Sequence, residues 1–248
     1  MTLQHFFENN PKVALAFSGG VDSAYLLYAA KETGADVKAY YVKTPFQPEF
    51  EYADAVRLAQ QLRADMVTLH LDVLSDSAIA ENPENRCYFC KKRIFSAILE
   101  QAKRDGYTLV IDGTNASDDA ADRPGMVALQ ELSVRSPLRE AGLTKAEIRR
   151  LSREAGLFTH DKPAYACLAT RIPANTPITQ QLLVVTEQCE TFLRELGFSD
   201  FRIRLMGTAA KIQIREAQLP LLLAHRAAIL TTLREHYSEV LLDLEVRQ

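Results

Sequence analysis

Six residues near the start of the chain, Ser18 to Ser23, have the side chains and the spacing that bind a phosphate group. They read Ser-Gly-Gly-Val-Asp-Ser and follow an apolar run at 13–17 that is typical of a buried parallel strand. Gly19 and Gly20 let the backbone approach phosphate oxygens and reach positive φ without a Cβ clash. A helix that begins directly afterwards points its first N–H groups and its positive dipole end at the anion. The segment therefore predicts an anion-binding turn between a strand and a helix.

The polar side chains of this turn could add hydrogen-bond donors and a metal ligand to the anion site. Ser18 and Ser23 can donate hydrogen bonds from their hydroxyl groups, and Asp22 can either cap the following helix or hold a metal ion. No lysine follows the glycines, which excludes the nucleoside-triphosphate loop that ends in Gly-Lys-Ser/Thr. A plain strand-to-helix turn with Asp22 as its N-cap is the alternative interpretation.

The complete hexapeptide resembles the PP-loop of ATP pyrophosphatases, the family that includes GMP synthetases, NAD synthetases and tRNA thiolation enzymes. The resemblance implies that ATP is cleaved between its α and β phosphates. A substrate oxygen would attack the α phosphate, AMP would become attached to the substrate, and pyrophosphate would leave into the glycine turn.

Three of the cysteines are placed where they could hold a metal or carry sulfur. Cys87 and Cys90 form a C-x-x-C motif in a basic stretch, and Cys167 lies much later in the chain. A zinc site would need donors beyond these three, whereas three thiolates can hold a four-iron cluster with one iron open to an extra sulfide. Incidental packing thiols are the bland alternative for the pair. Cys189 differs, because apolar residues at helical spacing surround it and predict a small core residue.

Composition narrows the class of protein. The chain has 248 residues, of which 47% are hydrophobic, so it can hold one large domain or two modest ones. The net charge of -3 gives no indication of nucleic acid or an anionic membrane as a partner. The start of the chain has no basic segment followed by an apolar run, and no apolar stretch approaches the roughly 20 residues of a membrane span. We therefore expect a soluble, cytoplasmic protein with reduced cysteines.

Strand and helix patterns alternate through the first part of the chain. Apolar or alternating runs predict strands, and longer amphipathic runs predict helices between them. The predicted strands are 12–17, 37–42, 65–71 and 108–112, and the predicted helices are 22–34, 50–62 and 91–104. This order indicates an α/β fold with a doubly wound parallel sheet. Ligands bind at the carboxyl ends of such strands, so we expect the segments after Phe17, Val42 and Asp112 to converge on one crevice.

The rest of the chain predicts a smaller α/β unit. A helix at 144–155 begins with a capping box formed by Thr144 and Glu147, and a polar, proline-rich loop follows at 160–179. Beyond it we expect helices at 180–196 and 219–236 and strands at 201–205, 210–214 and 240–246. We place the domain boundary between residues 175 and 176, with an ATP-binding and adenylation domain before it. The unit after it is expected to bind substrate and to form oligomers.

Four further blocks narrow the resemblance. They are RCYFCK (86–91), DGTNASDDAADRPG (112–125), SPLREAGLTKAEIR (136–149) and KPAYACLATRIP (162–173). Together with the glycine turn, and in this order, they resemble the LarE family of ATP-dependent sulfur transferases, which act in the synthesis of the nickel-pincer nucleotide cofactor. The resemblance runs to about Pro173 and continues weakly to the end of the chain.

The LarE resemblance implies a substrate and a role for each matched position. The substrate would be a pyridinium-3,5-dicarboxylate mononucleotide, whose carboxylates are adenylated and then converted to thiocarboxylates. Arg171, Arg202 and Arg204 would bind this substrate, the last two as a clamp for its 5′-phosphate, and Lys91 would act beside the cysteines. Mg²⁺ would lie at Asp22. Apart from the resemblance, one of Asp118, Asp119 and Asp122 could help to bind it, and a solvated acidic loop is the alternative interpretation of these three residues. ATP would contact Phe17, Ser18, Gly19, Gly20, Asp22, Ser23, Gly113 and Asn115.

Family members supply the sulfur in two ways, and both stay open here. Some sacrifice the sulfur of one cysteine, at the position of Cys167, which becomes dehydroalanine. Others have two more cysteines, at the positions of Cys87 and Cys90, and use a 4Fe-4S cluster. All three are present, so the chain resembles the cluster-dependent kind, which needs sulfide or another sulfur donor. The resemblance also implies a homo-oligomer.

Other functions and roles compete with this hypothesis. A tRNA thiolase, an ammonia-using amide synthetase and a non-enzymatic nucleotide-binding module would each share the turn. Arg202 and Arg204 alternate along a predicted strand, and an exposed polar strand face is their bland interpretation. The family pattern of a His-Gly-Asp-like turn after that strand is missing, because residues 205–208 read Leu-Met-Gly-Thr. This departure puts an acidic metal site or a family interface in this unit in doubt, and Glu190 could survive as one such carboxylate.

Overall fold

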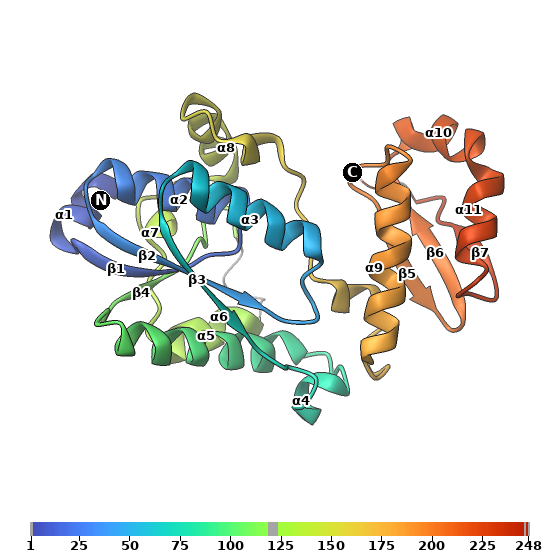
Figure 1. Ribbon diagram of the computed structural model, residues 1–248, viewed down its shortest axis with the longest axis horizontal. Helices are drawn as coiled ribbons and strands as arrows, with labels where there is room; N and C mark the ends of the chain where they lie inside the picture. The colour runs from blue at the N-terminus through green and yellow to red at the C-terminus, as the bar shows by residue number, and fades with distance from the viewer. Residues whose placement is uncertain (1, 119–123, 246, 248) are drawn as a thin grey trace. The chain divides into compact units, whose positions relative to one another are not determined.

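The protein, described here from a computed structural model, folds into two compact units. The structure describes residues 2–118, 124–245 and 247. Unit 1 comprises Met1–Val73 and Asn85–Lys162, and unit 2 comprises Leu74–Glu84 and Pro163–Gln248 (Figure 1). The division therefore differs from the expected boundary after residue 175, since Leu74–Glu84 and residues 163–175 group with the C-terminal part.

Unit 1 contains a parallel sheet. Its strands are β1 (Lys12–Ala16), β2 (Asp36–Lys43), β3 (Asp65–His70) and β4 (Val110–Ile111), in the order β3-β2-β1-β4. Every pair is parallel, and Leu15 lies opposite both Ala39 and Ile111. The doubly wound fold predicted from the alternation of strands and helices is confirmed.

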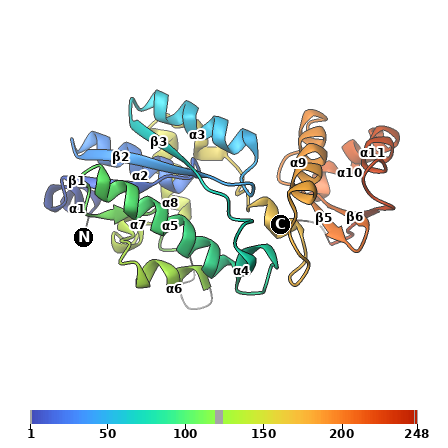
Figure 2. The ribbon, with the colours of Figure 1, turned by 60° about the horizontal axis from the view of Figure 1, so that its bottom comes forward.

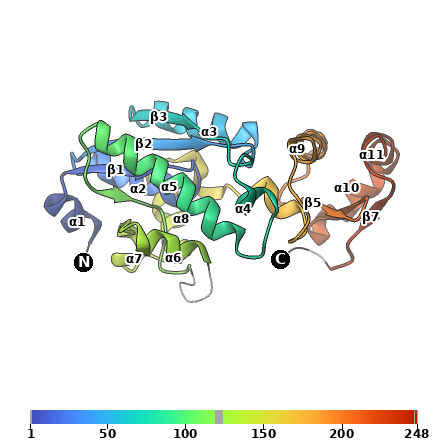
Figure 3. The same cartoon turned by 90° about the horizontal axis from the view of Figure 1, so that it is seen from below.

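Helices cover both faces of this sheet because alternate strand residues are apolar on both sides. Val13 and Leu15 pack in one core with α1 (Leu3–Asn9), α2 (Val21–Glu32), α3 (Glu49–Gln61) and α8 (Lys145–Glu154). Ala14, Tyr40 and Val42 face the other way, against α5 (Arg86–Arg104) and α6 (Pro124–Glu131). Figure 2 shows α3 on one side of the strands and α5 and α6 on the other. In Figure 3, α5 runs across that second face of the sheet, and α6 lies beside α5.

The C-x-x-C motif lies inside a helix rather than before one. The sequence predicts a helix from residue 91, whereas α5 begins at Arg86. Cys87 and Cys90 have helical spacing to Ile94 and Ile98, which pack on the sheet, so the helix extends back over the motif although neither cysteine belongs to that core. Four short helices were not predicted, because each is too short to show a clear period: α1, α4 (Ser77–Ala80), α6 and α7 (Pro137–Glu140).

Unit 2 has a three-stranded sheet with its helices on one face. β5 (Arg202–Met206) pairs antiparallel with β6 (Ala209–Gln213), which pairs parallel with β7 (Val240–Leu242). Cys189 and Leu193 of α9 (Gln180–Glu195) and Leu233 of α11 (Arg226–Leu233) share one apolar core with the strands. The predicted single helix at 219–236 is wrong. It is broken at His225 into α10 (Leu219–Ala224) and α11, after the short turn η3 (Glu216–Gln218).

The expected loop at 160–179 contains two single turns, η1 (Phe158–Asp161) and η2 (Leu168–Arg171).

Asn82 explains why Leu74–Glu84 belongs to unit 2. Its buried side-chain amide donates to the carbonyl groups of Pro173 (2.7 Å) and Thr176 (3.1 Å), and its own carbonyl accepts from the Asn175 N–H (2.8 Å). The capping box predicted at Thr144 and Glu147 is present at the start of α8. Within the described residues, no helix combines the length and apolar character of a membrane span.

Candidate functional site

The turn between β1 and α2 has the backbone geometry of an anion site. Gly19 has φ +71°, and a Cβ there would lie 2.8 Å from Cβ of Ala55, so only glycine fits. Gly20 is different, since its φ is -78° and it serves as the N-cap of α2. The expectation of positive φ is therefore confirmed for Gly19 and wrong for Gly20. The first N–H groups of α2 have no partner within the helix and can bind phosphate oxygens.

The two serines of the turn have different positions. Ser23 is buried, and its hydroxyl donates to the Gly20 carbonyl at 3.2 Å while it accepts from the Ser18 N–H at 3.3 Å. Ser18 is exposed, with its hydroxyl 3.1 Å from that of Ser23. Ser23 thus holds the turn from inside, and the Ser18 hydroxyl, which also accepts the Gly20 N–H at 3.4 Å, lies on its exposed side. The side chain of Phe17 lies in the core, which leaves only its backbone at the turn.

The loop after β4 touches this turn, as the sheet topology predicts. A Cβ at Gly113 would lie 2.9 Å from the backbone nitrogen of Ser23, so the two loops approach as closely as a glycine allows. Asp112 fixes the loop by accepting hydrogen bonds from the hydroxyls of Thr114 (2.5 Å) and Ser136 (2.6 Å). This placement brings the side-chain amide of Asn115 to 3.3 Å from the carboxylate of Asp22.

Lys145, the first residue of α8, lies beside Asp22 together with Asn115. Lys145 is not among the site residues predicted from the sequence. Its ammonium group forms an ion pair with the second carboxylate oxygen of Asp22. Asp22 therefore does not cap α2, and the alternative of a plain capped turn is wrong. The signal was present in the sequence, because the capping box at Thr144 marks a helix start beside this edge of the sheet. Lys145 supplies the cation that the glycine turn itself lacks.

Asp22 also has the chemistry of a magnesium ligand. Mg²⁺ typically takes one or two carboxylates and completes its shell with phosphate oxygens and water. Asp118 accepts the backbone N–H of Asn115 at 3.1 Å, whereas Asp119 and Asp122 lie outside the described residues. Among the residues described, no three His, Cys, Asp or Glu side chains lie close enough together to form a metal site.

Cys87 and Cys90 lie at the amino-terminal end of α5, in unit 1. They are one helical turn apart on the same face, with Cys87 exposed and Cys90 half-buried. An Nη2–H of Arg86 donates to Sγ of Cys87 at 3.8 Å. The neighbouring Lys91 lies against α6, because a Cβ at Gly125 would come within 2.7 Å of its Cδ. Two thiols in this arrangement suit two corners of a metal cluster.

Cys167 lies in unit 2, directly before η2, and is half-buried. Its carbonyl accepts hydrogen bonds from the hydroxyl of Thr170 at 2.8 Å and from the Thr170 N–H at 3.0 Å. Cys189 is buried in the core of unit 2, as predicted, and burial raises its pKa to about 11. Among the described cysteines, then, Cys189 is the one placed for packing.

The three arginines expected to bind substrate lie in unit 2 and point inward. Arg171 is fully buried in an ion pair with Glu190, Arg202 is buried, and Arg204 is half-buried. The bland interpretation of an exposed polar strand face is therefore wrong. Burial, together with the nearby cations Arg171 and Arg247, lowers the pKa of Arg202 to about 10. The surplus of positive charge is suited to an anionic group.

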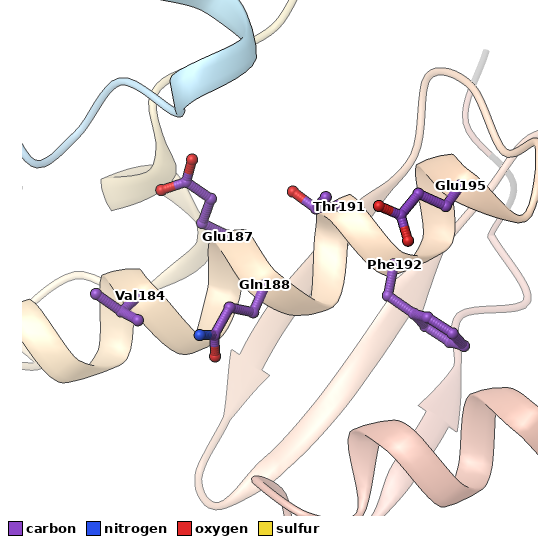
Figure 4. A pocket seen from close by; sticks show the side chains of 6 residues that line it. All are labelled: Val184, Glu187, Gln188, Thr191, Phe192 and Glu195. Carbon is purple, nitrogen blue, oxygen red and sulfur yellow. The ribbon is translucent and has the colours of Figure 1, made fainter.

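A separate hollow of about 490 Å³ follows the outer face of α9. The side chains that line it come from this one helix, and Glu190 is not among them (Figure 4). They are Val184, Glu187, Gln188, Thr191, Phe192 and Glu195. None of the residues predicted for the site lines this hollow.

Comparison with known proteins finds a matching domain family for the first part of the chain and relatives that are similar over most of its length. Residues 11–117 match the family model described as the tRNA methyl transferase HUP domain. An uncharacterized protein of Synechocystis is 34% identical over 88% of this chain and 81% of its own length. The pyridinium-3,5-bisthiocarboxylic acid mononucleotide synthase of Lactiplantibacillus plantarum is 33% identical over 88% of this chain and 80% of its own. The tRNA-specific 2-thiouridylase of Pseudothermotoga lettingae is 27% identical over 61% of this chain and 54% of its own length.

We expect Gly113→Ala to weaken ATP binding by at least about tenfold, because the new methyl group must push the β4 loop away from the backbone of Ser23. Isothermal titration calorimetry measures the change. Gly34→Ala is the control for a methyl group that meets no neighbour, because Gly34 has open space around it; its positive φ of +73° adds a local strain that Gly113 does not have. If both variants bind ATP as the wild type does, the close contact of the two loops is not needed for the nucleotide.

Lys145→Met should weaken ATP binding by about tenfold as well, since it removes a charge-assisted contact to phosphate while leaving the turn in place. Lys145→Arg keeps the charge and should bind within about threefold of the wild type. Isothermal titration calorimetry measures the affinity of both variants for ATP. Equal affinity of the Met variant and the wild type would show that Lys145 only neutralises Asp22.

Proposed function

The chain belongs to the LarE-type family of ATP-dependent sulfur transferases, and we propose that it converts a pyridinium-3,5-dicarboxylate mononucleotide into the bisthiocarboxylic acid. The observation that carries the proposal is the close packing of the β4 loop on the glycine turn in unit 1, where Asn115 and Lys145 both contact Asp22. This arrangement can hold the pyrophosphate of ATP. Unit 2, taken by itself, has Cys167 next to the buried guanidinium group of Arg171.

The chemistry follows from the weakness of a carboxylate as an acyl donor. One substrate carboxylate oxygen attacks the α phosphorus of ATP, the bond from that phosphorus to the bridging oxygen breaks, and pyrophosphate leaves. The N–H groups at the start of α2 and the ammonium group of Lys145 stabilise the charge on the leaving pyrophosphate. A sulfur nucleophile then adds to the carbonyl carbon of the acyl adenylate, and AMP leaves. The cycle repeats at the second carboxylate.

Other residues take roles that follow the family pattern. We assign Mg²⁺ to Asp22, with the phosphate oxygens completing its shell. Arg202 and Arg204 are the proposed clamp for the 5′-phosphate of the substrate, in a unit where burial already lowers the pKa of both guanidinium groups. Unit 2 is also the proposed surface for assembly into a homo-oligomer.

The sulfur is proposed to come from a 4Fe-4S cluster held by Cys87, Cys90 and Cys167. The donor set fits in kind, since these are three thiols and two of them are one turn apart on α5. Held by these cysteines, such a cluster would supply a sulfide as the nucleophile, with an external sulfur donor as the source of further sulfide. In the alternative, the Cβ–S bond of Cys167 breaks and its own sulfur stays with the product.

A tRNA thiolase is the second function with support, since thiouridylases are among the relatives. It shares the adenylation step and differs in the acceptor. The net charge of -3 does not favour an RNA partner.

The substrate decides between these functions. We expect AMP and pyrophosphate to form when the full chain, ATP and Mg²⁺ are mixed with the pyridinium dicarboxylate mononucleotide, but not with unmodified tRNA. Cys167→Ala should still form AMP, because adenylation does not use the thiol, and should lose the thiocarboxylate product by mass spectrometry. AMP formation that depends on tRNA alone would replace the proposed function with the thiolase.

Iron content separates the two sulfur sources. Protein prepared without oxygen should contain about four iron and four acid-labile sulfide atoms, and Cys87→Ala and Cys167→Ala should each lose them. Cys189→Ala is the control that should keep them, because Cys189 is a core residue. No iron in any sample, with a mass loss of one sulfur from Cys167 after turnover, would establish the sacrificial route.

A further inference from the structure

Protein groups hold the segment from Ala164 to Cys167 in unit 2 at every residue. The Ala164 carbonyl accepts from Nη2 of Arg202 at 2.7 Å, and the Ala166 carbonyl accepts from Nη1 of Arg171 at 3.0 Å. The hydroxyl of Tyr165 donates to Glu190 at 2.5 Å. The segment lacks regular structure up to η2, so these side-chain contacts replace a backbone ladder in fixing it.

Arg171 is the centre of this arrangement. Its side chain is 0% exposed, and its guanidinium makes a two-pronged contact with Glu190, with Nε–Oε1 at 2.7 Å and Nη2–Oε2 at 3.1 Å. The remaining nitrogen, Nη1, donates to the Ala166 carbonyl and to the hydroxyl of Thr170 at 2.8 Å. Thr170 in turn donates its hydroxyl to the Cys167 carbonyl. The donors of Arg171 are thus directed at the protein on both sides of Cys167.

Glu190 anchors the other end of the pair. It is 1% exposed, and it also accepts the backbone N–H of Ile203 on β5 at 3.0 Å. Burial disfavours the charge on Arg171, but the hydrogen bond and the charge of Glu190 outweigh burial, so the pKa of Arg171 is raised. Tyr165 reinforces the pair, because its ring centroid lies 4.7 Å from the guanidinium carbon of Arg171 and 5.2 Å from that of Arg202.

Stability alone gives little reason for this pair. Buried ion pairs are costly to desolvate, and apolar side chains of similar volume often stabilise a fold as well or better. Unit 2 already has an apolar core formed by α9, α11 and the strands. What apolar replacements could not supply are the hydrogen bonds from Arg171 to the Ala166 carbonyl and to Thr170.

We propose that Arg171 and Glu190 are positioning residues that hold the peptide of Cys167 for sulfur transfer, and that Arg171 does not contact the substrate. This inference rests on the proposed function, because only a reacting or ligating Cys167 needs an exact place. It replaces the substrate-binding role expected for Arg171 from the family resemblance and gives Glu190 a task other than holding a metal.

Alkylation of the full chain by iodoacetamide tests the placement without substrate. We expect Glu190→Gln to change the alkylation rate of Cys167 by at least about tenfold, measured by mass spectrometry on samples of equal iron content. Cys189 is the internal control, because it is 1% exposed and should stay unmodified while unit 2 is folded. Glu195→Gln, on the outer face of the same helix, should leave every rate unchanged (Figure 4).

A double variant separates positioning from stability. Arg171→Met with Glu190→Leu removes both charges, so unit 2 should stay folded and Cys189 should stay protected even if Glu190→Gln alone unfolds it. We expect this double variant to form AMP within about twofold of the wild type, while the thiocarboxylate product falls at least about tenfold.

Two results would overturn the inference. One is that Glu190→Gln leaves the Cys167 rate unchanged with unit 2 folded. The other is that the double variant restores both the wild-type alkylation rate and the wild-type yield of product. Failure of the wild type to form AMP with the pyridinium substrate would sink the proposed function instead, and the alkylation rates would still judge the placement of Cys167.

Discussion

The nucleotide site depends on one close contact, the approach of the β4 loop to the start of α2. Gly113 meets the backbone of Ser23 with no room for a side chain, and Gly19 meets Ala55 of α3 in the same way. These two glycines let three segments pack around one turn. Asn115 and Asp22 come within hydrogen-bond distance only because of this packing. A methyl group at either glycine would displace backbone, which unlike a flexible side chain has no cheap alternative position.

The same edge of the sheet explains why Lys145 belongs to the site. In a parallel sheet all strands end on one side, and helices that start at that side present their first turns there. The capping box of Thr144 sets where α8 begins, and the ammonium group of Lys145 then reaches Asp22. The starts of α2 and α8, distant in sequence, therefore contribute one charged group each, Asp22 and Lys145, to one ion pair.

In unit 2, the segment that contains Cys167 is held in place by another kind of interaction. This segment has no strand or long helix to fix it, so buried charged groups do so. Removing one member of a buried ion pair typically costs about 3–5 kcal/mol, because the other charge is left without its partner. The ion pair of Arg171 and Glu190, with the hydrogen bond from Arg171 to the Ala166 carbonyl, therefore ties the irregular segment to the buried part of unit 2.

Local sequence patterns predict the parallel α/β fold, the glycine turn, the capping box at Thr144 and the core position of Cys189, and the structure has all four. These features are local: each depends on a short period, on a glycine or on a cap within a few residues. The tertiary structure alone decided that α5 starts at Arg86, that Lys145 pairs with Asp22 and that Arg171 faces Glu190. The partners in the last two contacts are far apart in the chain. Arginine spacing along a segment cannot tell whether a guanidinium meets a ligand or a carboxylate of its own fold, because both satisfy the same donors.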